Sequence, residues 1–285
     1  MKYFKKILSC FTAILLLTTL CLPSAMAAQT LPLGLPPDSY PHTSAAPCST
    51  EDYSIKQIKG KINFTEAAGG FYYAYSPMST TYQSCFVNVL LPTGLNRAGV
   101  RNAYISLGIS GSKHGIDLGI CNQGSGWMPY SNDLREGTST NPAFRTYPDY
   151  VAPSTAKSAQ ITAKPVSTTK VHLYVQFQDA NGNNVGTAFD EDISVASGNL
   201  TMSGGKINCK FFRFASLVST TGDNQADGSY MTGGMFRYCQ LYNGSKYVSW
   251  GIGTNTVSDC FIHSTSHITL SYSGQNDTFN IRHNG

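Results

Sequence analysis

Hydrophobic and polar residues alternate along most of the chain after residue 53, most clearly between Tyr104 and Tyr130. Every second residue in two segments of this stretch is a large aliphatic: Ile105, Leu107, Ile109, Ile116, Leu118 and Ile120. A period of two predicts two strands joined by a short glycine-containing loop, with all six aliphatic side chains on one buried face. The opposite face holds small serines and glycines and is edged by Tyr104, Asp117 and Trp127.

The segment Lys170–Asp179 shows the same alternation. Val171, Leu173, Val175 and Phe177 are expected on its buried face, and His172, Tyr174 and Gln176 on the other. The following residues, 181–183, read Asn-Gly-Asn, which predicts a tight turn leading to a short strand near Val185–Phe189.

Further short strands are predicted along the rest of the chain, without a segment of sustained helical periodicity. They are Ser54–Phe64, Gly69–Tyr75, Ser84–Leu91, Lys210–Val218, Met235–Tyr242, Tyr247–Ile252, Asp259–His263, His267–Ser273 and Thr278–Arg282. Turn signals at Asn243–Gly244 and Gly274–Asp277 predict two hairpins, and 131–153 is expected to be a long irregular connection. The pattern predicts an all-β sandwich or closed barrel, mostly antiparallel.

The first 28 residues have the pattern of a secretory signal peptide. Three lysines precede an apolar run at 7–22, and small residues follow at Ala25, Ala27 and Ala28. The run is short for a spanning helix, so an uncleaved anchor is the weaker interpretation. Residues 29–52 contain five prolines and are expected to form a flexible leader, and 53–285 a single β-sandwich domain. The expected location is therefore extracellular or at the cell wall.

The net charge of the chain argues against nucleic-acid binding. The signal peptide holds three of the twenty basic residues and none of the sixteen acidic ones, so cleavage lowers the net charge from +4 to +1. A nucleic-acid partner is not expected at this charge, because such proteins carry a basic excess.

Six cysteines remain after removal of the signal peptide: Cys48, Cys85, Cys121, Cys209, Cys239 and Cys260. An even number in an oxidising compartment favours disulfides, with Cys239–Cys260 one candidate and buried free thiols the alternative.

No motif for catalysis or metal binding emerges. The segment 108–112 lacks the last glycine of a serine-hydrolase elbow. No pair of glutamates lies on one strand as a glycosidase of this fold would need. The acidic cluster Asp190–Asp192 is expected in a solvated turn, with calcium binding as the alternative. We predict no metal site and no cofactor.

The candidate ligand site combines the two best strand signals. We predict that the polar face of 104–121 and the outer residues of 170–178 share one concave sheet, with Trp127 or Trp250 as an aromatic platform. The predicted ligand-binding residues are Tyr104, Ser106, Asp117, Trp127, His172, Tyr174 and Gln176. Glycines in strands often mark the close approach of a ligand or of another part of the chain, so a loop packed over them is the alternative.

The segments Ile116–Tyr130 and Lys170–Asp179 resemble concanavalin-like jelly-roll proteins secreted by Gram-positive bacteria. The strand rhythm is also similar to that of glutamic peptidases, which pair a glutamine with a catalytic glutamate on one sheet face. Under that resemblance Gln123 or Gln176 would be the glutamine. The strand that should supply the glutamate reads Lys-Phe-Phe-Arg-Phe at 210–214 and has no acid.

These observations favour non-catalytic binding of a glycan or cell-wall polymer, in which sugar rings pack against tyrosine and tryptophan. One alternative is a glycan- or peptide-cleaving enzyme that uses Gln176, His172 and either Glu136 or Glu191. Another is a structural surface protein without a ligand.

Overall fold

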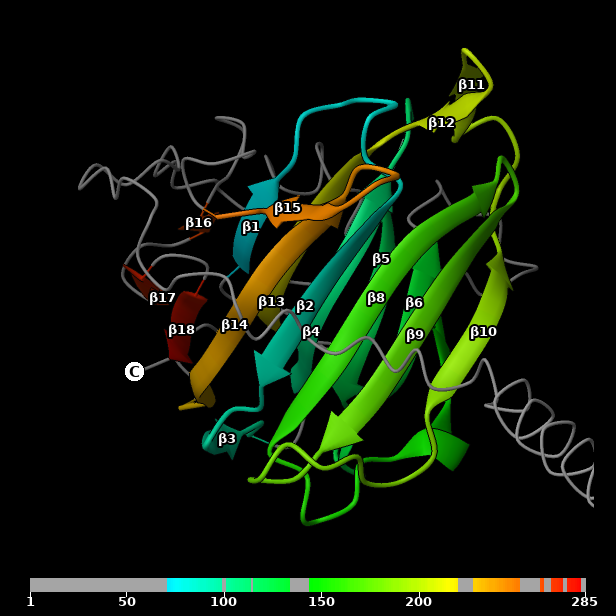
Figure 1. The fold of residues 1–285 in the computed structure, drawn as a ribbon. Helices are drawn as coiled ribbons and strands as arrows, with labels where there is room; N and C mark the ends of the chain where they lie inside the picture. The colour runs from blue at the N-terminus through cyan, green and yellow to red at the C-terminus, as the bar shows by residue number, and fades with distance from the viewer. Residues whose placement is uncertain are drawn as a thin grey trace, which may run out of the picture. The chain divides into compact units, whose positions relative to one another are not determined.

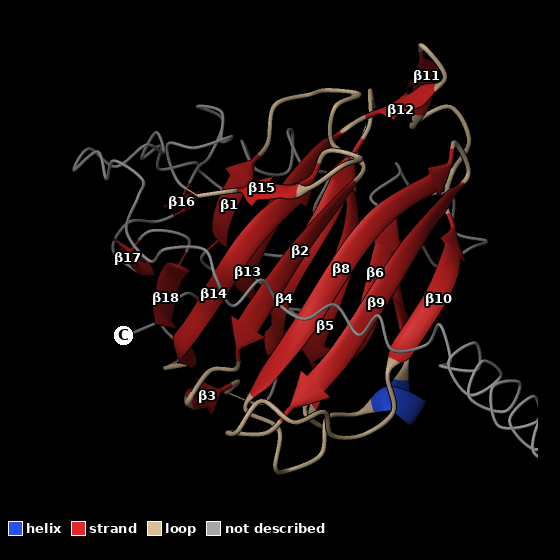
Figure 2. Ribbon diagram, in the orientation of Figure 1, coloured by secondary structure: helices blue, strands red, loops and turns tan. Residues whose placement is uncertain are grey.

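The computed structural model describes residues 71–98, 101–113, 115–133, 144–219, 228–251, 262–263, 268–273 and 276–282. All of them belong to one compact unit that spans residues 40–285. The predicted signal peptide, leader and first strand, Ser54–Phe64, lie outside the described residues. Figure 1 shows two layers of strands, and Figure 2 shows that the elements are strands apart from one short helical turn.

One described sheet has seven strands in the order β16-β1-β13-β4-β5-β6-β7, and every pair is antiparallel. Its strands are β1 (Phe71–Tyr75), β4 (Arg101–Ser110), β5 (Gly115–Asn122), β6 (Trp127–Asp133), β7 (Phe144–Thr146), β13 (Lys210–Ser219) and β16 (Ile262–His263).

The second described sheet has nine strands and is also antiparallel. Its main order is β10-β9-β8-β2-β14-β18-β17, while β3 and β15 pair with β14. Its strands are β2 (Ser84–Leu90), β3 (Gly94–Asn96), β8 (Ser158–Ser167), β9 (Lys170–Gln178), β10 (Phe189–Ser194), β14 (Tyr230–Tyr242), β15 (Tyr247–Ser249), β17 (Ile268–Ser273) and β18 (Asn276–Arg282). A separate pair, β11 (Thr201–Ser203) and β12 (Lys206–Asn208), forms a small hairpin, and η2 (Pro148–Tyr150) is a 3-10 turn.

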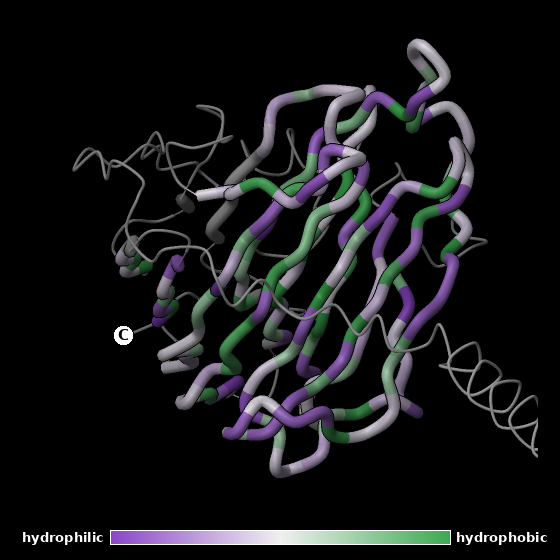
Figure 3. The backbone as a smooth tube through the Cα atoms, in the orientation of Figure 1, coloured by the Kyte–Doolittle hydropathy of each residue, from purple (hydrophilic) through white to green (hydrophobic). Residues whose placement is uncertain are grey.

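The core lies between the two sheets and follows from the alternation. The six aliphatic residues predicted on one face of 105–120 are fully buried, and so are Val171 and Leu173 of β9. Figure 3 shows hydrophobic and hydrophilic residues interleaved along the strands. The predicted all-β, mostly antiparallel sandwich is confirmed. Within the described residues, no helix is long and apolar enough to cross a membrane.

Several predicted elements were wrong or missing. The predicted irregular connection at 131–153 contains the end of β6, all of β7 and the η2 turn. Strand β8 was not predicted, since its buried positions include two alanines and its end carries Pro165, both unfavourable signals for a strand. The strand expected near Val185–Phe189 begins only at Phe189, so the acidic residues Asp190–Asp192 lie in edge strand β10 and not in a turn.

Two predicted turns are present. In the turn at 181–183, the backbone N–H of Asp179 donates to the Asn183 carbonyl at 2.9 Å, and Gly182 has a φ of 82°. The hairpin at Asn243–Gly244 joins β14 to β15, with Gly244 at a φ of 91°. Both glycines take the left-handed backbone conformation that such turns require.

Candidate functional site

The seven predicted site residues do not share one sheet, which corrects the prediction of a single concave face. Tyr104, Ser106 and Asp117 lie on β4 and β5 of the seven-stranded sheet, whereas His172, Tyr174 and Gln176 lie on β9 of the nine-stranded sheet. In all three strands the aliphatic residues that alternate with these polar residues fill the core between the sheets. The two groups therefore lie on the opposite outer faces of the sandwich.

The outer face of the seven-stranded sheet is closed by its own aromatic side chains. Phe212 of β13 pairs with Gly108 of β4, and a Cβ placed on Gly108 would lie only 2.0 Å from the Phe212 ring. Tyr130 of β6 pairs with Gly119, and its hydroxyl forms a short hydrogen bond with Ser106. Gly108 thus accommodates a ring from the neighbouring strand, whereas a Cβ on Gly119 would meet the Ile105 carbonyl oxygen and Ser106 of β4. Close packing within the sheet therefore accounts for both glycines, and no loop over them is needed.

Asp117 on this face is a buried carboxylic acid. Its side chain is 5% exposed, and desolvation raises its pKa well above the usual range. The pKa of Tyr130 is also raised well above its ordinary value, first by burial and then by the charge of Asp117, while the bond with Ser106 acts in the opposite direction. A carboxyl group of this kind stays protonated at a pH where an exposed aspartate is ionised.

Neither tryptophan is an exposed platform. Trp127 is 8% exposed and belongs to the core between the sheets. Trp250 is fully buried, and the guanidinium carbon of Arg213 lies 4.6 Å from the centroid of its ring. Both predictions of an aromatic surface at these residues were wrong.

The outer face of the nine-stranded sheet is mainly polar. Strand pairing places four polar residues in one line across β14, β2, β8 and β9, and we call this line the amide row: Arg237, Asn88, Gln160 and Gln176. The next line across the same strands contains Gln240, Phe86, Thr162 and Tyr174, and ends at Asp190 on β10.

Hydrogen bonds fix three side chains of the amide row, those of Arg237, Asn88 and Gln176. Arg237 donates from Nε to Asn88 Oδ1 at 2.9 Å, and Asn88 donates from Nδ2 to Gln178 Oε1 at 3.0 Å. Gln176 donates from Nε2 to the carbonyl oxygens of Phe177 at 2.9 Å and Val185 at 3.1 Å. Asn88 is 2% exposed and Gln176 is 5% exposed, so both amides are largely enclosed by the protein. Gln160 and Arg237 are the half-buried members of the row.

Sequence reasoning missed Asn88, Gln160 and Arg237. Each is a polar residue on a strand with a buried opposite face, which is an ordinary surface signal. Only the order of the strands in the sheet brings the three together, and the alternation pattern does not encode that order.

His172 lies at the edge of the same face. Its Nε2 is 3.1 Å from Asp190 Oδ1 and its Nδ1 is 3.0 Å from Asp192 Oδ1. Next to it, burial and then the charge of Asp190 raise the pKa of Tyr174. Despite this contact, the part of the chain that the structure describes contains no group of His, Cys, Asp and Glu side chains arranged to hold a metal ion.

The residues considered for a peptidase-like pair are not brought together. Glu191 pairs with Leu173, whose side chain lies in the core, so Glu191 is on the opposite side of the sheet from Gln176. Gln123 is exposed in the turn after β5, and Glu136 lies outside the described residues. On β13 the residue between Phe212 and Phe214 is a buried arginine, not an acid.

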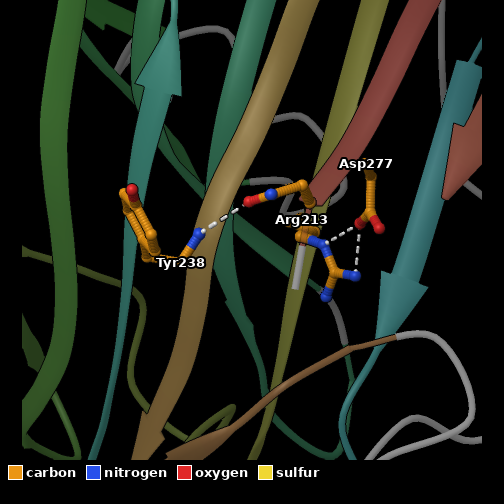
Figure 4. Close-up of polar contacts among 4 residues, drawn as sticks. Arg213, Tyr238 and Asp277 are labelled. Atoms are coloured by element: carbon orange, nitrogen blue, oxygen red, sulfur yellow. Dashed lines mark hydrogen bonds and ion pairs between the residues drawn. The ribbon is translucent and has the colours of Figure 1, made fainter. Parts of the chain in front are cut away.

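Arg213 forms a buried ion pair across the core. Its Nε and Nη2 donate to Asp277 Oδ2 at 2.9 and 2.5 Å, and both side chains are almost fully inaccessible. Because Arg213 is on β13 and Asp277 on β18, the pair links the two sheets (Figure 4).

The four described cysteines, Cys85, Cys121, Cys209 and Cys239, are buried free thiols. The predicted disulfides are therefore not found among them, and Cys239 does not pair with Cys260, which lies outside the described residues. Burial raises the pKa of Cys121, Cys209 and Cys239 to about 12 and that of Cys85 well above its usual value. Such thiols are poor nucleophiles near neutral pH.

No protein-family model matches the sequence, and no curated protein matches it. Solved structures with a similar arrangement of strands include scytalido-glutamic peptidase with a peptide-based transition-state analogue. That match has 10% identity, a TM-score of 0.45, and coverage of 75% of this chain and 98% of that chain. SCP-B, an eqolisin-family peptidase in complex with a tripeptide, matches with a TM-score of 0.44, 10% identity and the same two coverages.

A third similar structure is the CBM2 module of the evolved Dit protein of Lactobacillus casei BL23 phage J-1. It matches with a TM-score of 0.30 and 13% identity over 75% of this chain and 70% of that chain. At these identities all of the likenesses concern strand arrangement alone.

Proposed function

We propose that this protein is a secreted, extracellular or wall-associated β-sandwich of the concanavalin-like type that binds a glycan or cell-wall polymer without cleaving it. The proposed site is the outer face of the nine-stranded sheet, with His172, Tyr174 and Gln176 at one end. The amide row, which runs from Gln176 to Arg237, carries the proposal.

The residue types on this face suit a sugar polymer. A glycan presents many hydroxyl groups with fixed spacing, and amide side chains both donate and accept hydrogen bonds. Tyr174 lies in the neighbouring line and adds an aromatic ring with a polar tip, the combination that packs against a sugar ring. The other outer face offers fewer such groups, because its rings pack on the glycines and serines of the same sheet.

Retention on insoluble polysaccharides and peptidoglycan tests the proposal. The double substitution Tyr174→Ala and Gln176→Ala is expected to abolish the retention that the unchanged protein shows. Tyr104→Ala removes a tyrosine from the other outer face and is the matched control, which should be retained normally. If Tyr104→Ala loses retention and the double variant does not, binding would lie on the seven-stranded sheet, which would contradict the proposal.

A glycan- or peptide-cleaving enzyme is the second candidate, and Asp117 is the observation that favours it. A carboxyl group that burial keeps protonated is the form that a general acid needs. Soluble fragments released in the same assay, and lost on Asp117→Asn, would favour this function. A structural surface protein would show neither retention nor fragments, and would self-associate instead.

A further inference from the structure

Strand β14 contains a bulge at the Arg237 end of the amide row. Its pairing with β2 shifts register between Arg237 and Gln240. Phe236 before the bulge and Cys239 within it are both fully buried in the core. The two residues between them, Arg237 and Tyr238, therefore both point away from the core, where regular alternation would turn one of them inward.

The bulge exposes the Tyr238 ring. Tyr238 is 49% exposed, and it has a φ of 53°, in the left-handed region that tyrosine rarely adopts. Its backbone N–H donates to Asn276 Oδ1 at 3.4 Å. Figure 4 shows the Tyr238 ring on one side of β14 and the Arg213–Asp277 pair on the other. A strained backbone that presents an exposed aromatic ring points to a functional position more than to a packing position.

Arg237 supplies a positive charge beside that ring. Its guanidinium carbon lies 6.0 Å from the centroid of the Tyr238 ring. Nε and Nη2 are engaged by Asn88 Oδ1, whereas Nη1 makes no hydrogen bond, and Arg237 no ion pair, with any residue that the structure describes. Asn88 thus orients the guanidinium without neutralising its charge.

We propose that Tyr238 and Arg237 form an acidic-sugar subsite, in which a uronic acid ring of a polysaccharide stacks on Tyr238 while its carboxylate binds Arg237. This subsite rests on the proposed function and assigns the chemistry of its ligand. It also provides the exposed aromatic platform that neither tryptophan provides.

The geometry favours a carboxylate attached to the sugar ring itself. A planar guanidinium binds a carboxylate through paired, charge-assisted hydrogen bonds. In a uronic acid the carboxylate is bonded directly to the ring carbon, so stacking on Tyr238 brings the charge next to Arg237. A phosphodiester between sugars is joined through rotatable bonds outside the ring, so stacking would not fix its position.

Polygalacturonate and its methyl ester are the probes, because esterification removes the charge of the carboxylate and leaves the sugar backbone unchanged. With both polymers immobilised, the intact protein is expected to bind the acid form about tenfold more tightly than the ester, and added salt should reduce this preference. Tyr238→Ala is expected to weaken binding to polygalacturonate about tenfold, and Tyr238→Phe to preserve most of it. Arg237→Lys should lose most of the preference for the acid form, since lysine keeps the charge but lacks the paired hydrogen-bond donors of the planar guanidinium.

Thermal unfolding of the same variants separates binding from folding. Tyr238→Gly should unfold no earlier than the unchanged protein, because glycine accepts the observed φ, yet it should bind as weakly as Tyr238→Ala. A lower unfolding temperature for Tyr238→Gly would assign the ring a structural role and overturn the subsite.

The remaining outcomes distinguish the two proposals. Equal binding to the acid and the ester, with loss on Tyr174→Ala and Gln176→Ala, would overturn the subsite and leave the proposed function standing. Preference for a phosphate-bearing wall polymer over polygalacturonate would also overturn the choice of a carboxylate. Absence of retention on every polysaccharide would overturn both proposals.

Discussion

The two outer faces of this sandwich arrange their side chains in different ways. On the seven-stranded sheet, each large ring has a small neighbour in the adjacent strand: Phe212 beside Gly108, and Tyr130 beside Gly119. On the nine-stranded sheet, polar side chains stand next to one another along the amide row, and Arg237 donates a hydrogen bond to Asn88, which donates one to Gln178. The first arrangement fills its face with rings, and the second fills its face with polar side chains, of which Gln160 and Arg237 stay half-buried.

The contrast changes how small residues in a strand should be interpreted. Glycines in the stretch 104–121 suggested an approaching ligand, whereas in the structure the Phe212 ring fills the space at Gly108, and Ile105 and Ser106 of the adjacent strand fill the space at Gly119. Alternation of large and small residues across facing positions is a general way to fill a layer. The glycines of this stretch are therefore explained by packing within the sheet, and they are no evidence of a bound ligand.

The largest expected effect on stability comes from removing one partner of the Arg213–Asp277 ion pair, which links the two sheets. Arg213→Ala or Asp277→Ala should each lower the free energy of unfolding by about 3–5 kcal/mol, because each leaves a buried charge without its partner. Urea unfolding at neutral pH measures this loss. Retention on polysaccharide should fall only as far as the folded fraction falls.

The double substitution Arg213→Met with Asp277→Leu is the control for that prediction. It removes both charges and keeps apolar volume in the core, so it should recover most of the lost stability. If the double variant is as unstable as the sum of the single ones, the two charges act independently and the assignment of a coupled pair is wrong.

A smaller loss is expected when the closed face is overfilled. Gly108→Ala places a methyl group where the Phe212 ring lies, and overpacking of this kind costs about 1–3 kcal/mol. Chemical unfolding measures the cost, and retention of the folded protein should be unchanged because the proposed site lies on the other sheet.

Phe212→Ala supplies the matched background for Gly108→Ala. In that background the added methyl group should cost much less, since the ring that it meets is gone. A cost that is the same in both backgrounds would place the strain in the backbone of β4, and the ring would not be what closes this face.

The fold was largely predictable because burial follows local alternation. The faces of β4, β5 and β9 were predicted to the residue, and all of their aliphatic positions are buried. Errors occurred where local signals were weak or misleading, as at β8 with its alanines and Pro165. Strand β10 was predicted too early in the chain, because its acidic residues resemble those of a turn. In the structure Asp190 and Asp192 contact His172 of the adjacent strand.

The candidate site was less predictable because it depends on the order of the strands. Alternation shows which residues of one strand share a face, but not which strands share a sheet. Tyr104 and Tyr174 were therefore predicted on one surface and lie on two. The bulge at Tyr238 was also hidden, since the sequence around it continues the pattern of an ordinary strand and only the register reveals the shift.

A further prediction tests the closed face by pH. The folded state raises the pKa of Asp117 above its value in the unfolded chain, which is about 4. As the pH rises above about 4, the unfolded chain releases this proton while the folded protein retains it, so the native state loses stability until the folded pKa is passed. Asp117→Asn removes that dependence. Its stability relative to the unchanged protein should therefore increase between pH 4 and pH 7 in urea unfolding.

Asp179→Asn gives the opposite sign and serves as the comparison. The pKa of Asp179 is lowered, first by its hydrogen bonds to the Asn183 side chain and backbone, which hold the turn after β9. The ionised carboxylate stabilises this turn above the unfolded pKa, and the contribution disappears as the pH falls through the folded pKa. Asp179→Asn should thus lose stability at pH 7 and little at low pH. If both variants change with pH in the same direction, Asp117 is not the buried neutral acid that closes the seven-stranded face.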